Sequence, residues 1–140
     1  MVRIVLGVIA GFVAWSIVWV GSDQVLIQTL DWYRDHQLMF EKALVNKEAF
    51  LPNVTILGMN IGRSIIISIL AGFFAAFVAN ENKWSTLILG VLLLAFGTMV
   101  EILAWNYLPI WYHVVFLLLL IPMTIVGGKL KSVGPSPKTA

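Results

Sequence analysis

Four long runs of apolar residues constrain the fold of this chain more than any other feature. Spanning a bilayer as a helix takes about 20 mainly apolar residues. The runs are continuous rather than alternating, which argues against a transmembrane barrel. The sequence therefore predicts an all-α integral membrane four-helix bundle as a single domain over residues 1–131, followed by a flexible tail over residues 132–140. The predicted spans cover residues 4–20, 54–79, 84–108 and 109–126, and continuation of the first helix to Ile27 stays open.

The composition excludes a soluble globular domain. Hydrophobic residues make up 60% of the 140 residues and charged residues 11%, whereas about a quarter of the residues of an average soluble domain are charged. Nine basic residues against seven acidic ones give no charge excess that would favour nucleic acid as a partner. The absence of cysteine excludes disulfides and thiolate metal sites. We expect neither a metal site nor a cofactor.

The only long connection, between the first two spans, contains a predicted amphipathic helix over residues 31–51. Its apolar and charged residues fall on opposite helical faces, which is typical of a helix that lies at the membrane surface. The apolar face consists of Trp32, Tyr33, Met39, Phe40, Ala43, Leu44, Phe50 and Leu51. Two interpretations stay open, a lid packed on the bundle and a docking surface for a partner.

The distribution of basic residues predicts the orientation. Four spans place both termini on one side of the membrane, and that side carries five Lys and Arg residues against three on the other. Because cytoplasmic loops are enriched in Lys and Arg, we expect both termini to be cytoplasmic.

Arg63 and Glu101 are the only charged residues inside the four runs. Arg63 lies nine residues after Val54, and Glu101 lies eight residues before Pro109. At 1.5 Å of rise per residue the two charges lie at nearly the same depth, in the outer half of the bilayer. Because a lone charge in the membrane is costly, we predict that Arg63 contacts Glu101 directly or through one polar neighbour such as Asn60.

Other polar residues are predicted at the same depth, and Arg63 and Glu101 would form an intramembrane polar cluster with them. His113 is expected to bond a carbonyl, Asn106 or Glu101. As a structural element this cluster would fix the helix register; as a functional site it would bind a small polar ligand or a lipid headgroup. The neighbours are Asn60, Ser64, Asn106, His113 and Asp23.

Small residues recur at helical spacing in the first three spans. In lipid, small residues allow the close backbone approach that holds helices together. They serve either packing within the chain or association of two copies. The main positions are Gly7, Gly11 and Gly21 in the first run, Gly58, Gly62 and Gly72 in the second, and Gly90 and Gly97 in the third.

The stretch from Trp105 to His113 reads W-N-Y-L-P-I-W-Y-H and precedes an apolar run that ends at Pro122. It resembles a set of small bacterial inner-membrane proteins that share the signature W-x-x-F/L-P-x-W-Y-H before their last span. The resemblance covers the second half of the chain and implies a four-helix fold in the inner membrane of a bacterium, but no activity. Trp105, Trp111 and Tyr112 are expected to anchor this turn at the membrane interface.

No residue set in the sequence indicates catalysis, so we expect a non-enzymatic protein. It would act as an accessory, assembly, lipid-binding or partner-binding subunit. Its expected partners are membrane lipids, with a protein partner or a homo-oligomer as further options. The alternative is a small oligomeric transporter or channel that uses the polar site around Arg63 and Glu101.

Overall fold

A computed structural model describes residues 1–133, which form five helices joined by short connections. The helices are α1 (Val2–Thr29), α2 (Asp31–Asn46), α3 (Val54–Ala79), α4 (Trp84–Leu103) and α5 (Ile110–Val133). All except α2 are long and apolar enough to cross a membrane. The described part of the chain contains no strand. The prediction of an all-α membrane bundle with four spans is therefore confirmed.

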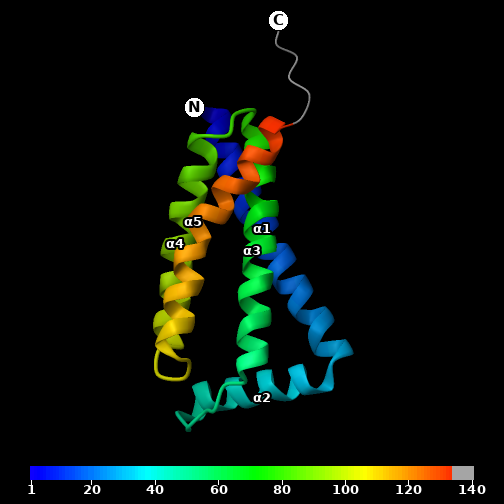
Figure 1. Cartoon of the computed structure of the whole chain (residues 1–140), viewed down its shortest axis with the longest axis vertical. Coiled ribbons are helices and arrows are strands. Elements are labelled where there is room, and N and C mark those ends of the chain that lie inside the picture. The colour runs from blue at the N-terminus through cyan, green and yellow to red at the C-terminus, as the bar shows by residue number, and fades with distance from the viewer. Residues whose placement is uncertain (134–140) are drawn as a thin grey trace, which may run out of the picture.

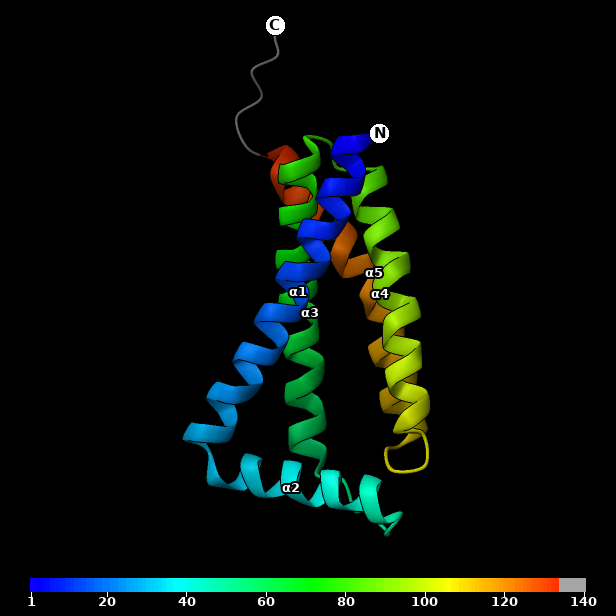
Figure 2. The ribbon, with the colours of Figure 1, turned by 180° about the vertical axis from the view of Figure 1, so that it is seen from behind.

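The four long helices run side by side, and α2 lies across one end of the bundle (Figure 1). This end also holds the α4–α5 turn and is called the α2 end below. The N-terminus and the α3–α4 connection lie at the opposite end, the termini end (Figures 1 and 2). The helix predicted at the membrane surface thus crosses the open end of the bundle.

The ends of several helices differ from the predicted ranges. Helix α1 extends to Thr29 and stops at Leu30, whose backbone is extended. Helix α2 ends at Asn46, because Lys47 adopts a left-handed conformation with φ of 54°. Helix α5 continues past Pro122 to Val133, so residues 132 and 133 are helical rather than part of a tail. Residues 134–140 of the predicted tail lie outside the described residues.

Glycines close the bundle at the termini end. A Cβ atom added to Gly72 would collide with the Thr124 carbonyl, and one added to Gly127 would collide with the Ile69 carbonyl, so α3 and α5 touch backbone to backbone. Gly7 of α1 lies in the same way against Ala75 and Ala79 of α3. These glycines therefore serve packing within the chain, as expected from their spacing.

The predicted glycines nearer the α2 end make no close packing contacts. No atom lies within 4 Å of a Cβ built on Gly21, Gly58 or Gly62. Helices α1 and α4 diverge in this half of the molecule (Figure 2). The bundle is thus tight at one end and splayed at the other.

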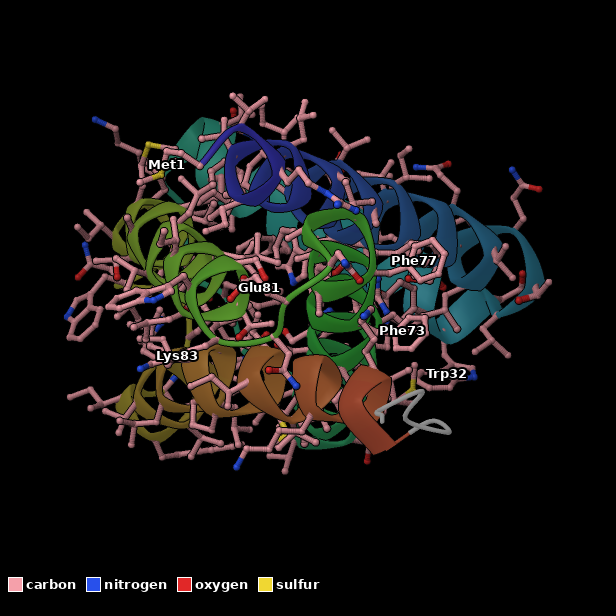
Figure 3. All side chains as sticks on the ribbon, turned by 90° about the horizontal axis from the view of Figure 1, so that it is seen from above. Met1, Trp32, Phe73, Phe77, Glu81 and Lys83 are labelled. Atoms are coloured by element: carbon pink, nitrogen blue, oxygen red, sulfur yellow. The ribbon has the colours of Figure 1, made fainter. Side chains whose placement is uncertain are left out.

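The connection between α3 and α4 is fixed by Glu81, which lies with Lys83 at the termini end (Figure 3). Its carboxylate accepts hydrogen bonds from the backbone N–H groups of Lys83, Trp84 and Ser85, at 3.0, 2.9 and 2.6 Å. Burial acts to raise the pKa of this carboxyl, but the hydrogen bonds outweigh it and lower the pKa to about 2. Glu81 therefore caps the start of α4 as an anion.

Candidate functional site

Arg63 of α3 joins three helices at the α2 end. Its guanidinium donates to the Trp19 carbonyl at 2.9 Å and to the Ser22 hydroxyl at 2.9 Å, both on α1. It also donates to the Tyr33 hydroxyl of α2 at 3.0 Å and to the Asn60 amide oxygen of α3 at 2.9 Å. The guanidinium carbon lies 4.4 Å from the centre of the Trp19 ring. Hydrogen-bond acceptors from three helices and one aromatic face therefore surround this cation, whose side chain is 12% exposed.

The ion pair of Arg63 is made with Asp23, at 3.4 Å, and the two side chains are 12% and 24% exposed. The predicted direct pair of Arg63 with Glu101 is wrong. Asn60, the predicted bridge, accepts a hydrogen bond from Arg63, but among the described residues it makes no hydrogen bond to Glu101. The extension of α1 to Thr29 carries Asp23 to the level of Arg63, and α1 packs directly against α3. The nearest carboxylate therefore comes from the first span and not from the third.

Tyr33 completes this network from α2. Its hydroxyl donates to Asp23 at 2.5 Å and accepts from Arg63. Burial and the hydrogen bond to Asp23 raise the pKa of Tyr33 above its usual value, so the hydroxyl keeps its proton. The network thereby fastens the first turn of α2 to α1 and α3.

Glu101 of α4 pairs with His113 of α5 instead. Glu101 Oε2 contacts His113 Nδ1, and both side chains are buried. His113 Nε2 lies 3.4 Å from the Trp105 carbonyl, and the Trp105 ring stacks on the imidazole at 4.5 Å. Of the three partners expected for His113, a carbonyl and Glu101 are confirmed. The pair joins α4 to α5 across their turn.

A cavity of about 280 Å³ is lined by members of both clusters, Trp19 and Asn60 from the first and Glu101 from the second. It lies in the splayed half of the bundle and draws its walls from all five helices. Six aromatic side chains and several aliphatic ones make the cavity mainly apolar. Asn60 and Glu101 contribute polar side chains to its walls from the spanning helices. The aromatic lining consists of Trp15, Trp19, Phe40, Phe96, Tyr112 and Phe116.

Helix α2 closes the cavity from its end. His36, Gln37, Phe40 and Leu44 line the cavity from this helix. His36 Nε2 accepts a hydrogen bond from the backbone N–H of Asn53 at 3.2 Å, and burial lowers the pKa of the His36 imidazole. His36 is therefore a neutral residue that ties the lid to the start of α3. The structure thus favours the lid interpretation of α2.

The other predicted site residues divide between the cavity and the surface. Asn60 accepts a hydrogen bond from Arg63 and lines the cavity together with Tyr112. Asn106 is exposed in the α4–α5 turn, beside Tyr107 and the residues after α2, and does not line the cavity. Its predicted place in the polar cluster is wrong, because the helix ends at Leu103 and the turn carries Asn106 away from the bundle axis.

The three interface aromatics also divide. Trp105 and Trp111 are 45% exposed, as expected of residues at the membrane interface. Tyr112 is buried and lines the cavity, which contradicts its prediction as an interface anchor. Neighbouring residues of a helix point in directions about 100° apart, so residue 112 faces inward when residue 111 faces outward.

The sequence left Trp15, Trp19 and Phe96 outside the predicted site. They contact one another ring to ring at centroid distances of 5.5 and 6.1 Å. Trp15 is 5% exposed, and its Nε1 atom has no hydrogen-bond partner among the described residues. A buried indole N–H without an acceptor costs roughly 1–3 kcal/mol. The recurrence of Trp15 and Trp19 one helical turn apart was the signal in the sequence that could have placed them together.

Comparison with protein-family models, with curated proteins and with solved structures finds no match for this chain. The resemblance of the segment from Trp105 to His113 to small bacterial inner-membrane proteins therefore stays a prediction. The interpretation of the site depends on its own geometry.

Proposed function

We propose that this chain is a non-enzymatic membrane protein that binds a lipid-like amphiphile in the cavity between α1 and α4. The observation that carries the proposal is the cavity itself, a mainly apolar space with a few polar groups in its walls. Its volume of about 280 Å³ is near the lower end of the range of roughly 300–1,000 Å³ for small-molecule sites. A single acyl chain with a small polar head fits a space of this size and character.

The position of the opening supports a ligand that comes from the membrane. Val100 and Leu103 line the cavity and are nevertheless 42% and 71% exposed. Both belong to α4, a helix apolar enough to span the bilayer. We infer that a ligand enters the cavity from the lipid beside these residues. The indole N–H of Trp15 supports a ligand with an acceptor oxygen, such as an ester carbonyl, near its polar end.

The location that we propose is the inner membrane of a bacterium, with both termini in the cytoplasm. The excess of Lys and Arg on the termini side supports this orientation, and the W-x-x-L-P-x-W-Y-H stretch supports the bacterial membrane. The α2 end and the cavity then lie on the periplasmic side. The ligand would come from the outer leaflet of that membrane.

The alternative, a small oligomeric transporter, was predicted to use both Arg63 and Glu101, and only one of these residues lines the cavity. Arg63 is fully engaged in contacts that hold α1, α2 and α3 together. Glu101 alone lines the cavity with a carboxylate. A transport role would therefore have to depend on Glu101 and its partner His113.

The test measures binding of a neutral ester, 3,3-dimethylbutyl decanoate, by calorimetry on the protein in lipid nanodiscs, with protein-free nanodiscs subtracted. Val100→Trp places a large ring at the cavity opening and should abolish saturable binding. Met99→Trp is the matched control, because Met99 is exposed on the same helix, at 55% against 42% for Val100, but does not line the cavity. Equal binding by both variants, or no saturable binding by the native protein, would overturn the proposal.

A further inference from the structure

The contacts of the Glu101–His113 pair determine how many protons the pair carries. The Trp105 carbonyl can only accept a hydrogen bond, so His113 Nε2 must carry a hydrogen to make the contact at 3.4 Å. The contact between Nδ1 and Glu101 Oε2 needs a second hydrogen, on either atom. The pair therefore contains two protons in this arrangement. Whichever atom holds the second one, the net charge of the pair is zero.

Losing one proton would leave the pair with a single negative charge facing the cavity. An isolated charge in such an apolar space is strongly disfavoured unless an opposite charge lies close to it. The Arg63–Asp23 ion pair cannot supply that charge, because Arg63 is already neutralised by its own carboxylate. A compensating cation would have to enter the cavity from outside.

The walls of the cavity suit such a cation. Trp15, Phe96 and Phe116 line it together with Glu101. Aromatic faces attract quaternary ammonium groups, and this attraction is strongest where water is excluded. A carboxylate combined with aromatic walls is thus a site for a hydrophobic cation, whereas an anionic head would find no Lys or Arg among the residues that line the cavity.

We propose that the cavity binds an amphiphile with a quaternary ammonium head, and that each bound cation releases one proton from the Glu101–His113 pair. The charge balances, since one positive charge enters as one leaves and no covalent bond except that to the proton changes. This inference rests on the proposed function, because it assigns the head group of the ligand in the same cavity. Bound cation and bound proton thus exclude each other.

Other titratable groups near the pair do not offer the same exchange. His36 already lacks the additional proton, because burial lowers its pKa and its Nε2 accepts a hydrogen bond. A phenol keeps its proton up to its ordinary pKa of about 10, and burial together with the hydrogen bond to Asp23 raises the pKa of Tyr33 further. Tyr33 and Tyr112 therefore stay protonated where the pair would exchange its proton. Besides Glu101, the titratable side chains that line the cavity are His36 of α2 and Tyr112 of α5. Asp23 of α1, Tyr33 of α2 and Arg63 of α3 belong to the neighbouring network and do not line the cavity.

The experiment compares two probes that differ by one charge. Decanoylcholine carries a quaternary ammonium head, and 3,3-dimethylbutyl decanoate has a carbon atom in place of the nitrogen. Calorimetry on the native protein in nanodiscs, in buffers with different ionisation enthalpies, counts the protons released per bound probe. We expect the affinity for decanoylcholine to rise with pH, by up to about tenfold per pH unit where release reaches one proton, and then to level off. The neutral ester should bind with pH-independent affinity.

Two variants locate the proton. Glu101→Gln should remove the pH dependence and the proton release, and should weaken decanoylcholine binding at least tenfold relative to the neutral ester. In His36→Gln, proton release per bound cation should persist, because the exchanged proton is not on His36. The native protein provides the decisive measurement even if Glu101→Gln is poorly folded.

The outcomes separate this inference from the proposed function. Binding of the neutral ester without binding of decanoylcholine, or cation binding without pH dependence or proton release between about pH 5 and 9, overturns the cation–proton exchange and leaves the lipid-like site in place. Saturable binding of neither probe overturns both. If proton release disappears in His36→Gln but persists in Glu101→Gln, the exchanged proton belongs to His36. This result also overturns the inference.

Discussion

Arg63 is the residue on which the α2 end of the molecule depends. Replacing Arg63 with Met would leave Asp23 partly buried without its cation and would free the hydrogen-bond partners on α1 and α2. Breaking a buried pair in this way typically costs about 3–5 kcal/mol of unfolding free energy. Reversible unfolding in mixed detergent micelles measures the loss.

Arg34→Met is the matched control for Arg63→Met. Arg34 pairs with Asp31 on the surface of α2, where the two side chains are 44% and 83% exposed. Exposed pairs contribute about 0–1 kcal/mol, so this variant should unfold almost like the native protein. Equal losses for the two variants would show that Arg63 acts no differently from a surface arginine.

A double-mutant cycle identifies the partner of Arg63. Arg63→Met combined with Asp23→Asn should lose less stability than the sum of the single variants, because the two residues interact directly. Arg63→Met combined with Glu101→Gln should be close to additive, since Glu101 pairs with His113. Strong coupling in the second cycle and none in the first would restore the pair that the sequence predicted.

The sequence identified both buried charges but assigned the wrong partners, for a physical reason. Counting residues along a span gives the depth of a side chain, and Arg63, Asp23 and Glu101 all lie towards the α2 end. Depth does not give the direction in which a side chain points or which helix is its neighbour. Those depend on helix rotation and packing, which the backbone contacts of Gly7 and Gly72 determine.

At the scale of helices, the contact between α3 and α5 is the tightest in the bundle. A Cβ at Gly72 would collide with the Thr124 carbonyl, and neither backbone can yield easily. Gly72→Ala should therefore lower the unfolding free energy by about 1–3 kcal/mol, as overpacking typically does. Gly62→Ala is the control on the same helix, because no atom lies within 4 Å of its Cβ.

For Gly62→Ala we expect the opposite sign. Alanine in a helix is favoured over glycine by about 0.5–1 kcal/mol, so this variant should be as stable as the native protein or more so. A loss at Gly62 as large as that at Gly72 would mean that the open stripe of Gly21, Gly58 and Gly62 is covered by a second copy of the chain.

The start of α4 depends on one carboxylate, and this gives a pH dependence. The pKa of Glu81 is lowered to about 2 in the folded protein from an ordinary value of 4.5. A lowered folded pKa contributes stability that is present above the ordinary value and is lost as pH falls towards the folded value. The unfolding free energy should therefore fall between about pH 4.5 and pH 2 in the native protein.

Glu81→Gln should remove that part of the pH dependence. It should also cost about 1 kcal/mol at neutral pH, the usual effect of losing a helix cap. Glu48→Gln serves as the control, because Glu48 is exposed beyond the end of α2. If Glu81→Gln kept the native acid profile, the carboxylate cap would not be the group responsible.

The sequence predicted which elements form better than where they end. All four spans and the connecting helix were found, because hydropathy and periodicity directly reflect which faces contact lipid or protein. The apolar span of the first run was predicted to end at residue 20, with continuation of the helix to Ile27 left open, and the helix runs to Thr29. The polar residues of these last turns are treated as loop by hydropathy, which makes the helix end hard to predict.

At the scale of the whole molecule, the distribution of close glycine contacts explains where the cavity lies. Gly7, Gly72 and Gly127 close the termini end, whereas Gly21, Gly58 and Gly62 make no such contact near the α2 end. Helices that touch backbone to backbone at one end and diverge at the other must leave space between them. Arg63 and α2 then join the helices around that space. The position of the site therefore depends on helix packing and could not be predicted from any single residue.

The orientation of the molecule is tested with single cysteines, because the native chain contains none. Glu41→Cys places a thiol on the exposed side of α2, and Lys83→Cys places one on the α3–α4 connection at the opposite end. With cytoplasmic termini, a membrane-impermeant maleimide should label Glu41→Cys in cells whose outer membrane is permeabilised and whose inner membrane is intact. It should label Lys83→Cys only after the inner membrane is also permeabilised. Both positions are solvent-exposed, so differences in labelling report sidedness and not burial. The reverse pattern would place the cavity on the cytoplasmic side, and its ligand would then have to come from the inner leaflet.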